Sequence, residues 1–395
     1  MKVAIVCDWL TNVGGAEKVL LRMHQLYPEA PIYTSKYNPK GIDWFRDADV
    51  RTGWMQIFPS GMRRLLGIFR QMYFSHLDLS EYDLIISVTG AEAKSVKSGK
   101  WLYDHKKKTK NPKGIHISFC HVPTQYYWQM YDDYVKNPGF GFLNPFVRFF
   151  FKLFVRPLRS ADYKAAKRPD YYITISEYAQ DAIRKYYGRE AIVIHPPVEV
   201  EEFMDKKIEK SGAKKVSKVF EKQDYYIVTS RQVNWKSLDL AVKACLMTQR
   251  KLLVIGEGPE HEKLVKLAKG TSLVKFLPLM NKSKLVSYLA GAKGYLFPSM
   301  EPFGIAPVEA LAAGCPVIAY GVGGARDYVK DGKNGILFEE QTAKSLAEAI
   351  LKFEKMKFKR SEIPKTVKDY GVSRFDKEIK GFMSKKTKEN TGEGE

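Results

Sequence analysis

The stretch MEPFGIAPVEALAAGCPVIA, residues 300–319, decides the fold because it predicts a loop, a helix, a stop signal and a strand in that order. Pro307 suits the first turn of a helix, since its missing N–H would have no partner there, and a glycine and a proline further on end that helix. A loop that leads into a helix leaves backbone N–H groups free to bind an anion. Glu301 and Glu309 flank this site, and carboxylates accept hydrogen bonds from sugar hydroxyls. The stretch therefore favours a ligand with both phosphate and hydroxyl groups, such as a nucleotide sugar.

The chain on the N-terminal side of this stretch alternates apolar strands with helical patterns. Alternation of this kind predicts a parallel sheet covered by helices. Arg231 and Lys236 follow the strand at residues 225–229, where the carboxyl ends of parallel strands bind ligands. Most lysines and arginines of this basic chain are solvated, but the shared edge favours a phosphate site for these two. A glycine turn at residues 321–324 falls on the same edge.

The first half of the chain predicts a second α/β series, with strands near residues 2–7, 84–88, 115–120 and 171–175. Gly14 and Gly15 lie between the first strand and a helix. Two interpretations are open: a tight turn that needs glycine, or a place where a phosphate or sugar approaches the backbone. His121 follows a strand at the carboxyl edge of the predicted sheet. A lone histidine is more often structural, but this position favours a functional role.

Residues 140–156 combine phenylalanines with three cations spaced four residues apart. That spacing puts the cations on one helical face, and a basic and apolar segment at residues 62–70 resembles it. One interpretation is a helix in the membrane interface, and the other is a core helix with snorkelling cations. The residues predicted to contact a membrane are Arg63, Arg64, Arg148, Phe149, Phe150 and Lys152.

Composition and charge narrow the class of protein. The chain has 395 residues, which predicts two domains, and a net charge of +21, which favours polyanionic partners. Its four scattered cysteines predict buried thiols, and the sequence has no CxxC pair that would suggest a metal site. No apolar run is long enough for a membrane span. With no signal peptide in MKVAIVCDWL, we expect a soluble cytoplasmic protein. A proline pair and charged residues set the predicted domain boundary at residue 198, with domains 1–198 and 199–370. Residues 371–395 should form a terminal helix and a disordered tail.

Six motifs in this order resemble family 4 retaining glycosyltransferases of the GT-B fold, in which two Rossmann-like domains have parallel sheets that face each other across a cleft. Within that family the chain is similar to mannosyltransferases that build surface polysaccharides and lipid-linked glycans. The resemblance covers most of the chain. Its carriers are Gly14-Gly15-Ala16-Glu17, Cys120-His121-Val122-Pro123, Ile194-His195-Pro196-Pro197-Val198, Ser230-Arg231 with Lys236, Gly256-Glu257-Gly258-Pro259, and Glu301 with Glu309.

The resemblance implies that the second domain binds the donor and the first the acceptor. Arg231 and Lys236, with the backbone N–H groups of Phe303, Gly304 and Ile305, would bind the donor diphosphate and stabilise the leaving group without a metal or cofactor. The terminal helix would pack back toward the N-terminal domain.

The resemblance also implies roles for the remaining site residues. Glu309 would accept hydrogen bonds from the ribose, and Glu301 from the transferred sugar. Gly14 and Gly15 would lie against the donor, and His121 would face the reacting sugar and the acceptor.

The donor and the acceptor stay open at this stage. GDP-mannose is the first choice, and UDP-glucose, UDP-galactose and UDP-N-acetylglucosamine are alternatives, because the loop 232–235 ends on an aromatic residue and a proline follows Glu301. The expected acceptor is a lipid-linked or polysaccharide glycan at the inner face of an anionic membrane. A nucleotide-sugar epimerase of the same fold is an alternative, and so is a nucleic-acid-binding protein, which the dispersed basic residues disfavour.

Overall fold

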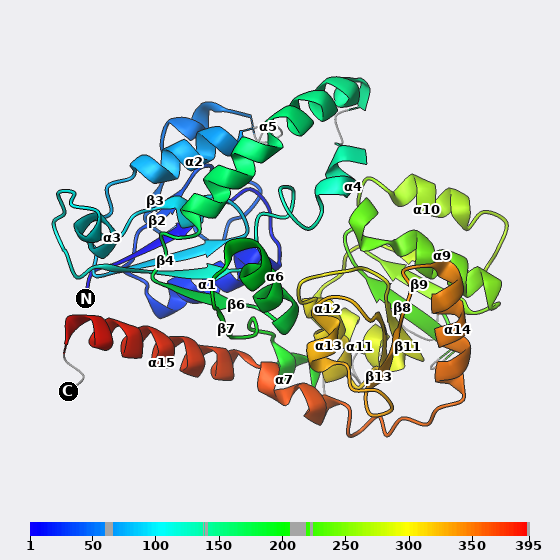
Figure 1. Ribbon diagram of the computed structural model, residues 1–395. Coiled ribbons are helices and arrows are strands. Elements are labelled where there is room, and N and C mark those ends of the chain that lie inside the picture. Colours follow the sequence, from blue (N-terminus) through cyan, green and yellow to red (C-terminus); the bar gives the residue numbers. More distant parts are fainter. Residues whose placement is uncertain (60–65, 137, 139–140, 206–218, 222–223, 393–395) are drawn as a thin grey trace. The chain divides into compact units, whose positions relative to one another are not determined.

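The computed structural model describes residues 1–59, 66–136, 138, 141–205, 219–221 and 224–392, and the chain forms two units (Figure 1). The N-terminal unit contains Met1–His195 and Asp376–Glu395, and the C-terminal unit contains Pro196–Phe375. The boundary therefore follows His195, three residues before the predicted one. The last part of the chain belongs to the N-terminal unit.

The N-terminal unit is built on a seven-stranded parallel sheet in the order β3-β2-β1-β4-β5-β6-β7. β4 and β5 are buried along their whole length, as expected for central strands covered on both faces. The strands are β1 Val3–Cys7, β2 Ile32–Thr34, β3 Val50–Arg51, β4 Leu84–Thr89, β5 Ile115–Cys120, β6 Tyr171–Thr174 and β7 Ile192–Val193.

The helices of this unit follow local signals where the sequence is clear. At α6, Glu177–Tyr187, the Ser176 side chain accepts from the backbone N–H of Ala179, and Gly188 ends the helix at φ 57°. The other helices are α1 Gly15–Leu26, α2 Gly67–His76, α3 Gly99–Asp104, α4 Tyr131–Lys136 and α5 Asn144–Ala165, with short 3-10 turns at η1 Trp54–Ile57, η3 Ala93–Ser95 and η4 Gly141–Leu143.

The C-terminal helix α15, Val372–Thr391, is longer than predicted. We expected a helix at residues 374–383 and a disordered tail from residue 385, but the helix continues to Thr391. Contacts of the additional turns within the N-terminal unit explain the difference: the Lys386 ammonium lies 4.7 Å from the centroid of the Tyr171 ring, and the Lys113 ammonium donates to the Thr391 carbonyl at 3.3 Å. Residues 393–395 lie outside the described part of the chain.

The C-terminal unit is built on a six-stranded parallel sheet in the order β10-β9-β8-β11-β12-β13. The strands are β8 Tyr225–Thr229, β9 Lys251–Ile255, β10 Val274–Leu277, β11 Gly294–Phe297, β12 Val317–Tyr320 and β13 Gly335–Phe338. The helices are α7 Val200–Phe203, α9 Leu238–Met247, α10 His261–Leu267, α11 Lys282–Gly291, α12 Ile305–Ala312, α13 Ala325–Tyr328 and α14 Ala343–Glu354, with 3-10 turns at η5 Asn234–Lys236 and η6 Pro364–Tyr370.

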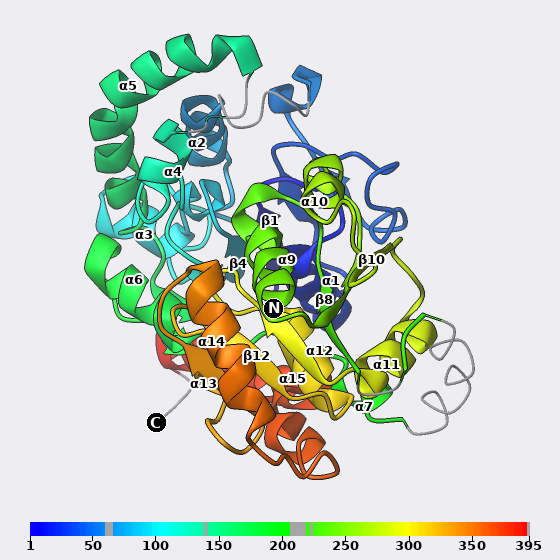
Figure 2. The same ribbon diagram turned by 90° about the vertical axis from the view of Figure 1, so that its right-hand side faces the viewer.

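Helices lie on both faces of this sheet (Figure 2). Alternate residues of a strand point to opposite faces of a sheet. Tyr226 and Val228 join a buried cluster with residues of α9 and α14. The neighbouring Tyr225 points the other way, and its hydroxyl donates to the Tyr288 carbonyl of α11 at 2.6 Å. The sheet is thus covered on both faces, as the sequence predicted.

The four cysteines, Cys7, Cys120, Cys245 and Cys315, are buried free thiols, as predicted. Among the helices in the described ranges, none has the length and hydropathy needed to cross a bilayer.

Candidate functional site

The loop between β11 and α12 brings two predicted site residues together. The ammonium of Lys236 lies 2.6 Å from Oε1 of Glu301, and the Ser299 hydroxyl donates to the same carboxylate oxygen at 2.8 Å. About a fifth of each charged side chain is exposed, 23% for Lys236 and 19% for Glu301. A cation and a carboxylate therefore meet at the carboxyl edge of the sheet, within reach of solvent.

The predicted glycine turn after β12 fixes the backbone of Glu301. The backbone N–H of Gly324 donates to the Glu301 carbonyl at 2.9 Å. Gly323 has φ 108°, and a Cβ on it would lie 2.4 Å from the same carbonyl oxygen. Because only glycine fits this approach, the turn positions Glu301 without contacting its carboxylate.

Gly304 sets the start of α12. It has φ 89°, and an added Cβ would lie 2.6 Å from Cζ of Phe297. Phe303 is buried, and its carbonyl accepts from the Tyr328 hydroxyl at 2.9 Å. The backbone that leads into Ile305 is therefore held by packing, which suits the anion site predicted there.

Glu309 lies two residues further from the start of α12 than predicted. We expected a helix beginning at Pro307, but it begins at Ile305, because Gly304 allows the chain to turn two residues earlier. Glu309 and Glu301 are half-buried, and their charges affect the phenol of Tyr295. Burial raises the pKa of Tyr295, hydrogen bonds from Thr229 oppose this rise, and the negative charges of the two glutamates add to it. Both predicted carboxylates thus lie around one buried side chain.

The loop after β8 carries Arg231 and Lys236 in different environments. The exposed Arg231 guanidinium lies over the ring of Trp235, 5.6 Å from its centroid. The aromatic residue that made this loop unusual therefore supports the arginine. Lys236 pairs with Glu301 instead, so the two side chains predicted to bind phosphate have different partners.

The glycine turn at residues 256–259 braces this loop. A Cβ on Gly258, at φ 158°, would lie 2.3 Å from the Gln232 carbonyl, and one on Gly256, at φ 126°, would lie 2.2 Å from the Ser230 carbonyl. The side-chain oxygen of the buried Gln232 also accepts from Nδ1 of His261 at 2.8 Å. This glycine turn, one carrier of the family resemblance, thus supports the loop that carries Arg231.

His121 lies at the carboxyl end of β5 in the N-terminal unit, and its backbone N–H donates to the Thr89 carbonyl at 2.8 Å. Among the described residues, no side chain or backbone group pairs with its buried Nε2 atom. Burial lowers the pKa of His121 to about 4, so its imidazole is neutral at pH 7. A neutral imidazole with an unused nitrogen can exchange a hydrogen bond with a hydroxyl group.

Gly14 and Gly15 lie at the start of α1. Gly14 has φ −162°, an extended conformation that any residue adopts, and within the described chain Gly15 is not among the glycines with positive φ. The interpretation as a turn that needs glycine is therefore wrong at these positions. The close approach of a ligand to the backbone stays a prediction.

A buried charge cluster next to His121 was missed by the sequence reasoning. The carboxylate of Asp8, just after β1, accepts from the Thr89 hydroxyl at 2.9 Å and from the backbone N–H of Ala93 at 2.7 Å. Burial, and then the charge of Glu92, raise the pKa of Asp8. Glu92 pairs with Arg70 at 2.9 Å. The only sequence signal was the position of Asp8 and Glu92 after two central strands.

A second buried pair holds the loop after His121. Lys94 lies 2.6 Å from Asp162 of α5, and Asp162 also accepts from the indole of Trp128 at 2.8 Å. Burial opposes the charge on Lys94, but Asp162 holds the pKa of the ammonium above its usual range. Removing either partner would leave an uncompensated buried charge, so the pair fixes α5 against this edge.

The predicted membrane-contact residues lie on α5, except Arg63 and Arg64, which are outside the described residues. Phe149 is 64% and Phe150 52% exposed, and Lys152 is exposed as well. The Arg148 guanidinium donates to the carbonyls of Val135 and Lys136 at 2.9 and 3.0 Å, which ties α5 to the end of α4. Arg148 therefore has a structural role that the sequence did not indicate.

Comparison with known families places the C-terminal unit. Residues 209–370 match the model described as Glycosyl transferases group 1. Poly(glycerol-phosphate) alpha-glucosyltransferase of Bacillus subtilis (strain 168) is 32% identical over 34% of this chain and 23% of that protein. An uncharacterized glycosyltransferase of Methanocaldococcus jannaschii is 26% identical over 47% of this chain and 50% of that protein. The chain thus spans about a quarter to a half of the length of these curated relatives.

Solved structures match along the whole chain. Anabaena Alr3699/HepE in complex with UDP-glucose aligns with a TM-score of 0.68 at 18% identity, covering 98% of this chain and 100% of that one. WaaG, a glycosyltransferase involved in lipopolysaccharide biosynthesis, aligns with a TM-score of 0.62 at 16% identity, covering 99% and 100%. These likenesses confirm the predicted GT-B fold class. The family match confirms a group 1 glycosyltransferase domain.

Proposed function

We propose that this chain, which carries a group 1 glycosyltransferase domain in a GT-B fold, transfers a hexose from a nucleotide sugar to a glycan acceptor with retention of configuration and without a metal. The observation that carries the proposal is the pair Lys236–Glu301, held at 2.6 Å directly ahead of α12. A cation and a carboxylate beside a helix N-terminus support the binding of a sugar diphosphate at this place.

The proposed reaction breaks the bond between the anomeric carbon and the diphosphate oxygen. Lys236, Arg231 and the backbone N–H groups at residues 303–305 stabilise the negative charge on the departing diphosphate. The acceptor oxygen forms the new bond on the same face of the sugar, and its proton passes to the diphosphate. Glu301 accepts hydrogen bonds from the transferred sugar and Glu309 from the ribose.

The N-terminal unit is the proposed acceptor side. His121 offers a neutral imidazole with an unused nitrogen to a sugar or acceptor hydroxyl. Gly14 and Gly15, at the start of α1, would lie against the donor.

The donor nucleotide is the first property to test. HepE has been crystallised with UDP-glucose, so we test this donor together with our first choice, GDP-mannose. A donor that binds the folded state at one hundred times its Kd stabilises that state by about 2.7 kcal/mol. Thermal shifts with UDP-glucose, UDP-galactose, UDP-N-acetylglucosamine and GDP-mannose therefore identify the donor, and analysis of the sugar products separates transfer from epimerisation.

Two substitutions test the site. Lys236→Ala removes the cation at the leaving group, and Glu309→Ala removes the proposed ribose ligand. We expect each to lower kcat/KM at least a hundredfold, which corresponds to about 2.7 kcal/mol of transition-state stabilisation. Steady-state kinetics with the identified donor measures the loss, and circular dichroism shows that the fold is intact.

Lys243→Ala is the matched control, because Lys243 forms a lysine–carboxylate pair with Asp239 at 2.8 Å on the surface of the same unit. Its kinetics should equal those of the unmodified enzyme. Unchanged turnover in both Lys236→Ala and Glu309→Ala would show that the donor site has been wrongly assigned.

A further inference from the structure

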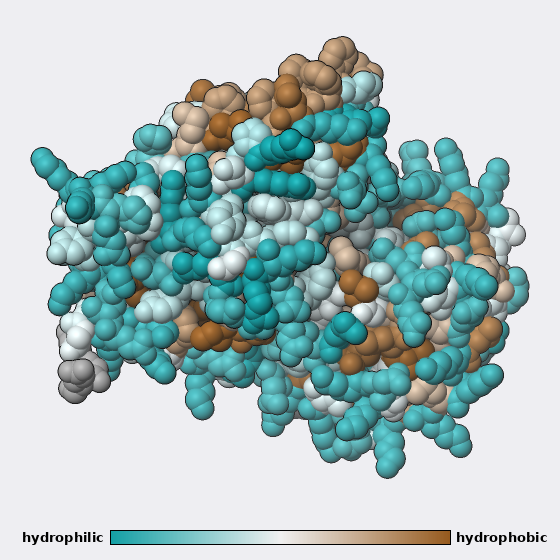
Figure 3. All heavy atoms as spheres, in the orientation of Figure 1, coloured by the Kyte–Doolittle hydropathy of each residue, from teal (hydrophilic) through white to brown (hydrophobic). Residues whose placement is uncertain are grey.

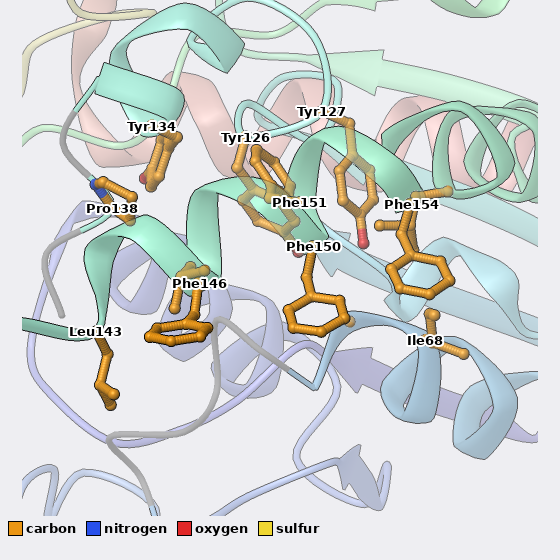
Figure 4. A pocket seen from close by; sticks show the side chains of 13 residues that line it. Ile68, Tyr126, Tyr127, Tyr134, Pro138, Leu143, Phe146, Phe150, Phe151 and Phe154 are labelled. Atoms are coloured by element: carbon orange, nitrogen blue, oxygen red, sulfur yellow. The ribbon is translucent and has the colours of Figure 1, made fainter.

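An apolar pocket lies between α5, α2 and the segment that follows β5 (Figure 4). Its volume is about 360 Å³, within the range of small-ligand sites. Among the described residues that line it, none is charged, and aromatic rings form much of the wall. The hydroxyl of Tyr126, on the wall, is already bonded to the buried Glu92. Such a largely apolar wall favours a hydrocarbon ligand.

The pocket continues into an exposed apolar stripe on α5. At 3.6 residues per turn, one face of this helix carries Phe146, Phe149, Phe150, Leu153 and Phe154. These side chains are between 44% and 67% exposed. Figure 4 shows the rings of Phe146, Phe150 and Phe154 projecting from the same side of the helix, and these three also line the pocket. Phe149 and Leu153 belong to the stripe but not to the pocket.

The same hydrophobic surface extends onto α2. Ile68 lines the pocket and is 47% exposed, and its neighbours Phe69 and Met72 are exposed to a similar extent. Figure 3 shows hydrophobic residues gathered over α5 and α2. An apolar area of this kind next to a pocket marks an interaction site.

The charges of α5 indicate what covers this surface. The exposed cations Arg148, Lys152 and Arg156 flank the stripe on the side away from the pocket. The acid on α5, Asp162, is buried against Lys94. Two copies of the chain would bring like charges together at this surface, whereas an anionic lipid interface neutralises them.

We propose that the pocket binds one hydrocarbon chain of the phosphate-bearing lipid that carries the acceptor, while the exposed stripe on α5 rests in the membrane interface. The inference rests on the proposed function, since it names the lipid part of the acceptor. The pocket draws the chain of a single lipid out of the bilayer. It thereby holds the lipid's phosphate and sugar at the surface of the N-terminal unit.

Decyl phosphate, a single-chain phosphate amphiphile used below its micelle concentration, is the probe. Isothermal titration calorimetry should show one saturable site with a negative heat-capacity change. Val147→Trp fills the pocket from α5, since Val147 lines it but is not part of the stripe. We expect this variant to bind decyl phosphate at least tenfold more weakly and to sediment with phosphatidylglycerol vesicles as the unmodified protein does.

Leu153→Ser is the matched variant on the stripe. It should lose vesicle binding at least tenfold and keep its affinity for decyl phosphate. If Val147→Trp is not folded by circular dichroism, Phe151→Trp fills the same pocket from the next turn of α5.

The inference is overturned if the unmodified protein does not bind decyl phosphate, if the folded pocket variant binds it equally well, or if Leu153→Ser weakens it as much. The thermal shift with nucleotide sugars is measured on the same proteins. A normal shift together with failed decyl phosphate binding rejects the lipid pocket alone. An absent shift in the unmodified protein rejects the proposed function, whatever the lipid result.

Discussion

At the scale of single residues, the uncharged state of His121 determines how the N-terminal unit responds to acid. Burial lowers the pKa of His121 to about 4, and that of the fully buried His116 to about 3, against about 6.5 in an unfolded chain. The unfolded state therefore binds more protons than the folded state between pH 6.5 and these lower values. Stability is lost as the pH falls through this window, and it is fully present above pH 6.5.

His121→Asn should reduce this acid sensitivity. The contribution of His121, discounted for its partial exposure, is about 1–3 kcal/mol between pH 7 and pH 4. Urea unfolding at both pH values measures it, with the exposed His105→Asn as the control. Since His121 stays neutral, kcat/KM of the unmodified enzyme should show no ionisation near pH 6.5. An inflection at that pH that disappears in His121→Asn would contradict the neutral imidazole.

The sequence predicted the positions of single residues better than their partners. Glu301 and Lys236 each lie in a loop after a predicted strand, where topology alone puts them on one edge. Their ion pair could not be predicted, and neither could the pair Arg70–Glu92. A charge pair depends on the packing of distant segments, which leaves no periodic pattern in the sequence.

At the scale of elements, the start of α12 depends on one glycine. Gly304 adopts a φ of 89°, which costs other residues about 1–2 kcal/mol. A side chain there would also overlap the ring of Phe297 and the hydroxyl of Tyr328, at 2.6 and 2.9 Å. The geometry of the proposed diphosphate site is therefore set by the absence of a Cβ.

Gly304→Ala should destabilise the protein by at least about 2 kcal/mol and weaken donor binding more than tenfold, because it combines backbone strain with overlap. Thermal unfolding and donor titration measure the two effects. Gly381→Ala is the control of opposite sign: Gly381 lies within α15 with open space around it, so alanine should stabilise the helix by up to about 1 kcal/mol. A Gly304→Ala variant with normal donor affinity would contradict this account of α12.

Elements with strong patterns were predicted, and weakly patterned ones were not. The buried strands β4 and β5 were evident as apolar runs. The strand β2 and the edge strand β3, of three and two residues, are too short to show any alternation. The end of α15 is polar, and the sequence therefore predicted disorder. Its helical state depends on contacts with the N-terminal unit, which the sequence pattern does not show.

At the scale of the whole molecule, the N-terminal unit is assembled from both ends of the chain. The α15 side chains Ile379 and Met383 are completely buried, and Asp376 pairs with Arg22 of α1. Residues 376–395 therefore contribute to the stability of this unit.

A chain that ends at Phe375 should lose about 3–6 kcal/mol from the N-terminal unit, since burial of each of the two apolar side chains contributes about 1.5–3 kcal/mol. Scanning calorimetry should show a lower transition for this unit. A chain that ends at Thr391 keeps these contacts and is the control. Equal transition temperatures in the two chains would show that α15 does not stabilise the unit.

The discontinuity of the N-terminal unit also has a consequence for biosynthesis. Met1–His195 leaves the ribosome first, but its last helix follows only after Pro196–Phe375 has been made. At about 5–20 residues per second, this delay is roughly 10–40 s. During that time the apolar surface that Ile379 and Met383 later cover is open to water, so the nascent chain should recruit a chaperone until α15 has been made.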